Sequence, residues 1–74
     1  MSAKIPRLRA DEVTRVLQQH GFVFVSQRGS HQKWRHPDTG KQVIVPYHKG
    51  KQLPIGTLRS IITGSGILEE EFVP

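Results

Sequence analysis

One short run of the sequence, QRGSHQKWRHP from residue 27 to residue 37, gathers side chains that can move protons and hold negative charge. His31 stands among three basic residues, Arg28, Lys33 and Arg35. Histidine can act as a general acid or base near neutral pH, and cations stabilise the charge that develops on phosphate oxygens. RNA carries its own nucleophile, the 2′-hydroxyl. The run is therefore a candidate site for handling phosphate, although a surface histidine in a basic strand would have the same composition.

The alternation of side chains along an extended strand divides this run into two faces. A strand over residues 31–36 places His31, Lys33 and Arg35 on one face and Gln32, Trp34 and His36 on the other. Gly29 and Ser30 form a turn signal just before it, so they are expected to present His31. Trp34 could stack on a base, but a lone tryptophan in a small domain is expected to anchor the core.

Two other chemistries find little support in the sequence. Zinc would need several ligands on one side, yet His31 and His36 lie an odd number of residues apart and face opposite ways. The two remaining histidines are His20 and His48, and the chain contains no cysteine. Ser30 is adjacent to His31, but no G-x-S-x-G motif and no phosphate-binding glycine loop occurs. We therefore expect no metal and no cofactor.

Length and charge set the class of protein and of partner. The chain has 74 residues and a formal net charge of +5, which predicts a single domain over residues 1–74 and a polyanionic partner. Asp38 is the single acid among the cations between residues 28 and 51. The absence of cysteine suits the cytoplasm. No apolar run approaches the roughly 20 residues of a membrane span, and the N-terminal residues lack the apolar core of a signal peptide.

Periodicity predicts an α-β-β-β-α order. Residues 10–20 show a helical apolar face that ends at Gly21. A second helix is expected to begin with Pro54 as its first residue and to end at Gly64 or Gly66. Strands are expected at 22–28, 31–36 and 42–46, joined by short turns that make the sheet antiparallel. In the first strand, regular alternation puts Ser26 on one face and Gln27 on the other. The expected fold is α+β, with two helices on one face of a three-stranded sheet.

Three segments together resemble the HicA-type toxin family of prokaryotic toxin–antitoxin systems. They read LQQHGFVFVSQRGSHQKW, VIVPYHKGKQL and GTLRSIITGSGILEEEF, and the resemblance spans about residues 7–72. It implies a double-stranded-RNA-binding-domain-like fold and a metal-independent endoribonuclease that cleaves mRNA. It also implies a HicB-type antitoxin that blocks the active site. The catalytic histidine of the G-S-H motif is His31 here, and Gln32 stands where members often have a second histidine.

These observations define an expected site with His31 as the catalytic residue. Residues expected to contact RNA are Arg28, Gly29, Ser30, Lys33, Arg35, His48, Lys49 and Lys51. His48 is included because it matches the histidine of the family's V-P-x-H motif. Two alternatives remain open from the residues alone. One is an RNA-binding module of the same fold without cleavage; the other is a protein-interaction subunit that uses the acidic EEEF segment or the basic face.

Overall fold

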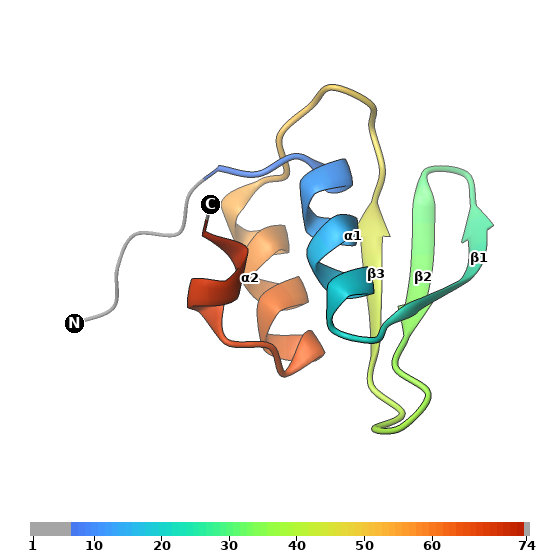
Figure 1. The fold of residues 1–74 in the computed structure, drawn as a ribbon. Coiled ribbons are helices and arrows are strands. Elements are labelled where there is room, and N and C mark those ends of the chain that lie inside the picture. The colour runs from blue at the N-terminus through green and yellow to red at the C-terminus, as the bar shows by residue number, and fades with distance from the viewer. Residues whose placement is uncertain (1–6, 74) are drawn as a thin grey trace.

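The computed structural model describes residues 7–73 of the chain, and its elements follow the predicted order (Figure 1). The elements are α1 (Ala10–Gln19), β1 (Val23–Arg28), β2 (His31–Arg35), β3 (Gln42–Pro46), α2 (Ile55–Ser65) and a short 3-10 helix, η1 (Glu69–Phe72). Gly66, with φ of 72°, ends α2 in a left-handed cap. Residues 1–6 and 74 of the predicted domain lie outside the described part.

The three strands form one antiparallel sheet in the order β1-β2-β3. Both helices pack on β3, and α1 also packs on η1, so the β1–β2 hairpin extends beyond α1 (Figure 1). Every residue of β1 is exposed, as expected for an edge strand that no helix covers. This confirms the predicted α+β fold, with two helices beside one antiparallel sheet.

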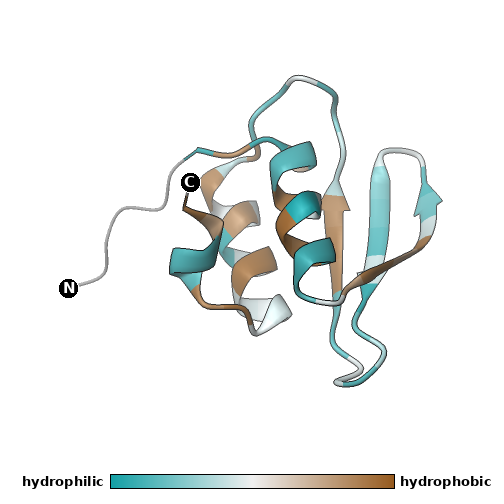
Figure 2. Ribbon diagram, in the orientation of Figure 1, coloured by the Kyte–Doolittle hydropathy of each residue, from teal (hydrophilic) through white to brown (hydrophobic). Residues whose placement is uncertain are grey.

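The hydrophobic core lies between the helices and β3. Figure 2 shows hydrophobic segments in α1, α2 and β3, whereas β2 is mostly hydrophilic. Val13 and Leu17 of α1, Leu58 of α2 and Val45 of β3 are fully buried in one core cluster. Trp34 is 5% exposed, which confirms its predicted place in the core. Burial of this kind contributes roughly 25 cal/mol for each Å² of apolar surface removed from water, so Trp34 ties the exposed hairpin to the core.

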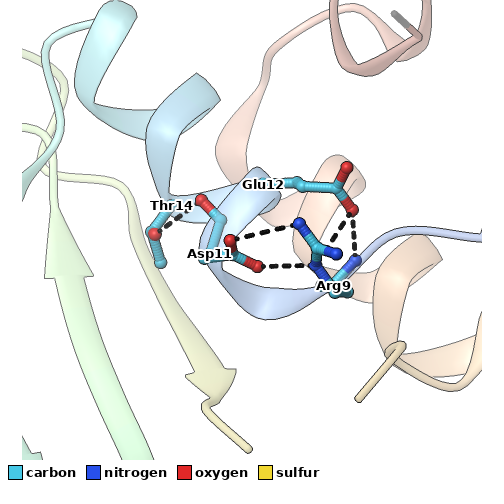
Figure 3. A network of polar contacts seen from close by, with 4 residues as sticks. All are labelled: Arg9, Asp11, Glu12 and Thr14. Carbon is cyan, nitrogen blue, oxygen red and sulfur yellow. Dashed lines mark hydrogen bonds and ion pairs between the residues drawn. The ribbon is translucent and has the colours of Figure 1, made fainter. Parts of the chain in front are cut away.

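The start of α1 is held by a local network around Arg9 (Figure 3). The Arg9 backbone N–H donates to Glu12 Oε1 at 2.8 Å, and Arg9 Nε donates to Asp11 Oδ1 at 3.1 Å. Thr14 Oγ1 donates to the Asp11 carbonyl oxygen at 3.2 Å. The bond from the Arg9 guanidinium lowers the pKa of Asp11, and the same bond raises the pKa of Arg9. The negative charges of Asp11 and Glu12 also interact favourably with the positive N-terminal end of the helix dipole, which stabilises α1.

The alternation predicted for the first strand is wrong beyond Phe24. Phe24 lies opposite Trp34 and Ser26 lies opposite Lys33, so Val25 is an extra residue without a partner, a β-bulge. Trp34 and Lys33 are neighbours on β2 and point to opposite faces. Phe24 and Ser26 therefore also face opposite ways, although regular alternation would put them on the same face.

Candidate functional site

The outer face of the hairpin brings His31 together with two of the predicted cationic residues. Arg28 lies opposite His31 across β1 and β2, and Lys33 follows His31 on the same face. Directly opposite residues in an antiparallel pair have Cβ atoms about 4.5–5.5 Å apart, and side chains two residues apart on a strand are about 6.7 Å apart. A surface hollow of about 520 Å³ opens here. Its lining residues are Ser26, Gln27, Arg28, His31, Lys33 and Ile44.

The charges around this hollow are free to meet an anionic ligand. His31, Arg28 and Lys33 are all exposed. The ion pairs within residues 7–73 involve Arg9 and His20, and none of them involves a residue of the hollow. Unpaired cations around a concave surface attract phosphate groups and raise their local concentration. The contrast with Arg9 is informative, because that guanidinium is already occupied by Asp11.

The turn that precedes His31 is held from both sides. Gly29 has φ of 59°, which suits the first central position of a two-residue hairpin turn. Gln27 Nε2 donates to the Gly29 carbonyl oxygen at 2.9 Å. The Tyr47 backbone N–H donates to the Ser30 carbonyl oxygen at 2.6 Å. The two predicted residues Gly29 and Ser30 thus form the support of His31 and connect it to the segment that follows β3.

Other predicted contact residues lie away from this hollow. Arg35 shares the face of His31 but is four residues along β2, about 13 Å away. The Arg35 guanidinium lies near the turn between β2 and β3. A Cβ built on Gly40 of that turn would be 3.8 Å from Arg35 Nη2. His48 and Lys49 line a second hollow, also of about 520 Å³, together with Arg9, Asp11, Tyr47 and Gly50.

The loop that carries the last two predicted lysines is attached to the chain before α1. Gln52 forms an isolated bridge with Arg9, and the Leu53 N–H donates to the Leu8 carbonyl oxygen at 2.7 Å. Lys51 is exposed on this loop, as is Lys49. The structure therefore divides the predicted residues into a group at His31, an outlying Arg35, and a loop group beside α1.

Three lining residues were not predicted from the sequence. Ile44 is 45% exposed and lies opposite Lys33 on β3. Strict alternation between the buried residues Val43 and Val45 could have placed Ile44 on the outer face. Ser26 carried no such signal, because the bulge at Val25 moves it to the outer face. Gln27 pairs with Gln32 on the other face and lines the hollow from the edge strand β1, which alternation does not predict.

The remaining histidines have separate surroundings. His36 Nδ1 accepts hydrogen bonds from the backbone N–H groups of Asp38 and Thr39, and the His36 ring packs edge-on against Phe22 at 5.2 Å. His20 Nε2 lies 3.5 Å from Glu71 Oε1. The part of the chain from residue 7 to 73 contains no cluster of three or more metal-ligand residues. No helix among those residues is long and apolar enough to cross a membrane.

A known protein family matches most of this chain. The family model described as the HicA toxin of bacterial toxin–antitoxin systems matches residues 10–67, from the start of α1 to just beyond α2. No curated protein sequence matches the chain. The family match covers well over half of the 74 residues. It includes the G-S-H turn, His31 of the first hollow and His48 of the second. The chain therefore belongs to the HicA family of bacterial toxins.

Proposed function

We propose that this toxin is an endoribonuclease that cleaves mRNA without a metal ion, with His31 as its general acid/base. The observation that carries the proposal is the placement of His31 in an exposed hollow between Arg28 and Lys33. No ion pair within residues 7–73 occupies these three side chains. An imidazole beside two free cations supplies both proton transfer and stabilisation of phosphate charge.

The reaction uses the nucleophile that RNA contains. The 2′-oxygen of one nucleotide attacks the adjacent phosphorus while its proton passes to a general base, and the bond from phosphorus to the 5′-oxygen breaks. The 5′-oxygen leaves with a proton, so the products are a 2′,3′-cyclic phosphate and a 5′-hydroxyl. His31 accepts the proton of the 2′-hydroxyl and, as the imidazolium, donates it to the leaving 5′-oxygen. Arg28 and Lys33 stabilise the non-bridging oxygens, whose negative charge increases in the transition state.

The outlying cations extend the RNA-binding surface beyond the cleaved bond. Arg35 lies farther along the same sheet face, and Lys49, Lys51 and His48 lie on the loop beside α1. In this proposal these residues contact backbone phosphates of neighbouring nucleotides. Such contacts position the strand and increase affinity without reading its sequence.

A HicB-type antitoxin is the proposed protein partner, acting in the cytoplasm where mRNA is found. An antitoxin that blocks the site must cover the hollow at His31. Apolar side chains on the same sheet face favour such contact, because Ile44 of the hollow and Val23 farther along the face are each about half exposed. Covering these side chains would stabilise the complex through the hydrophobic effect.

The alternative is an RNA-binding module of the same fold that does not cleave. The same exposed cations would give it affinity, and double-stranded RNA is read mainly by shape and by phosphate and 2′-hydroxyl contacts. Incubating the purified protein with RNA in EDTA distinguishes the two functions. The proposal predicts cleavage in EDTA. Intact RNA, together with binding that weakens as salt increases, would support the module instead.

A further inference from the structure

A chain of three side-chain hydrogen bonds runs behind the hairpin from the core to the turn before His31. Trp34 Nε1 donates to Gln32 Oε1 at 3.1 Å. Gln32 Nε2 donates to Gln27 Oε1 at 3.4 Å. Gln27 Nε2 then donates to the Gly29 carbonyl oxygen at 2.9 Å. The chain therefore links a buried side chain to the backbone of the exposed turn.

The direction of this chain is fixed by its two ends. An indole N–H can only donate and a backbone carbonyl can only accept. Gln32 must therefore turn its oxygen toward Trp34, and Gln27 must turn its nitrogen toward Gly29. The two groups left over, Gln32 Nε2 and Gln27 Oε1, are a donor and an acceptor that face each other. Each link is thus satisfied by one arrangement of the amides.

The chain lies on the side of the sheet opposite His31. Gln32 is the residue after His31 on β2, and it faces Gln27 on one side and the buried Val45 on the other. Trp34, its starting point, packs edge-on against Phe24 with ring centroids 5.7 Å apart. Gln32 faces away from the imidazole of His31, so its effect on His31 passes through Gln27 and the backbone of the turn. Gln27 also lines the hollow, so Gln32→Met is the variant that acts through the hydrogen bonds alone.

We propose that Gln27 and Gln32 are positioning residues that hold the Gly29–Ser30 turn so that His31 faces Arg28 across the hollow. This inference rests on the proposed catalytic role of His31. The turn lies at the tip of a hairpin whose outer strand is exposed along its whole length, and such tips open readily. The glutamine chain holds the Gly29 carbonyl, while the Tyr47 N–H holds the Ser30 carbonyl at 2.6 Å.

The test compares the variants Gln32→Met and Gln27→Met with the unchanged full-length protein. Methionine has a similar length and no charge but cannot continue the chain. Gln42→Met is the matched control, because Gln42 is an exposed glutamine of the same sheet that takes no part in the chain. We measure kcat and KM for RNA cleavage, amide hydrogen exchange at Ser30 and His31, and the unfolding midpoint. His31→Ala is measured beside them.

The proposal expects kcat to fall about tenfold in both chain variants, because small displacements of a catalytic group are costly. KM should stay within about twofold, since the cations that bind phosphate are unchanged. Exchange at Ser30 and His31 should accelerate in these variants and not in Gln42→Met. Unchanged kcat in both variants, with His31→Ala inactive, would overturn the positioning role and leave the proposed function intact.

The His31→Ala variant also tests the proposed function on which this inference rests. If His31→Ala cleaves RNA as fast as the unchanged protein, the proposed function fails, and the positioning role fails with it. If either Gln27→Met or Gln32→Met does not fold, the other still tests the positioning role, because each removes a different hydrogen bond. Gln32→Glu adds a third measurement: it keeps the acceptor for Trp34 and loses the donor to Gln27, so the positioning role again predicts a lower kcat.

Discussion

Arg28 and His31 face each other across the β1–β2 hairpin, as the first pair of residues below the Gly29–Ser30 turn. The bulge at Val25 accommodates this pairing. It allows Phe24 to pack against Trp34 while Ser26 and Arg28 lie on the outer face with His31. Without the bulge, Phe24 and Ser26 would lie on the same face. With it, β1 both contacts the core through Phe24 and places a charged residue, Arg28, on the outer face.

Removing one cation of the hollow should weaken RNA binding and its dependence on salt. For Lys33→Gln, the slope of log affinity against log salt should become shallower by about 0.7–1, the effect of losing one phosphate contact. Arg28→Gln should act in the same way. Arg59→Gln is the matched control, because it removes an equal charge from an exposed position on α2. Equal effects of all three substitutions would mean that net charge, and not the hollow, determines binding.

Much of the fold followed from local patterns in the sequence. The helical spacing of Val13 and Leu17 predicted the buried face of α1, and both residues are fully buried. Gly66 ends α2 as a glycine with positive φ can. These features depend on neighbouring residues in the sequence, so periodicity is enough to find them. The buried position of Trp34 followed from alternation along β2, where the register is regular.

The site was less predictable because it depends on contacts between elements. Nothing in the sequence VFVSQR marks Val25 as the extra residue. Every residue of this strand is exposed, so burial does not dictate whether a polar or an apolar side chain stands at each position. His48 matches a family motif, yet it lines a separate hollow with Arg9 because the Arg9–Gln52 bridge fixes its loop. The interaction of Gln27 with Gln32 likewise depends on the register set by the bulge.

The hairpin should depend more on Trp34 than on Phe24. Trp34→Ala removes a side chain that is 5% exposed and should lower the free energy of unfolding by about 3–5 kcal/mol. Phe24 is 50% exposed, so Phe24→Ala should cost about 1–2 kcal/mol. Urea denaturation measures both. A larger loss for Phe24→Ala than for Trp34→Ala would contradict the assigned core.

The Arg9–Asp11 pair should make a small, pH-dependent contribution to stability. The pKa of Asp11 is lower in the folded protein than its ordinary value because Arg9 hydrogen bonds to the carboxylate. The folded state therefore binds this proton less readily than the unfolded chain. The contribution is complete above an unfolded pKa of about 3.9 and is lost as pH falls through the lower folded pKa.

The variant Asp11→Asn tests this linkage. Its urea midpoint should lie below that of the unchanged protein at neutral pH, and the gap should narrow as pH falls below about 3.9. The effect should be small, because both side chains are exposed. Asp38→Asn serves as the control, since Asp38 forms no ion pair within residues 7–73. A gap that stays constant over this pH range would exclude the pair as its cause.

The proposed reaction requires the 2′-hydroxyl of the substrate. An RNA with 2′-O-methyl groups at the cleaved positions should bind with similar affinity, because the phosphates are unchanged, and should remain intact. Unmodified RNA should yield fragments with 5′-hydroxyl ends. Both results can be read by gel electrophoresis, with phosphorylation by a polynucleotide kinase to label free 5′-hydroxyls. Cleavage of the methylated strand, or fragments with 5′-phosphates, would exclude this route.

The central claim is that His31 is the catalytic residue, and the rate of RNA cleavage by His31→Ala in EDTA tests it most directly. General acid–base catalysis contributes about 10²–10⁴-fold, so the rate should fall by a factor in that range while RNA binding persists. His20→Ala, which removes an exposed imidazole near Glu71, should cleave at close to the original rate. Undiminished cleavage by a folded His31→Ala variant would contradict the account.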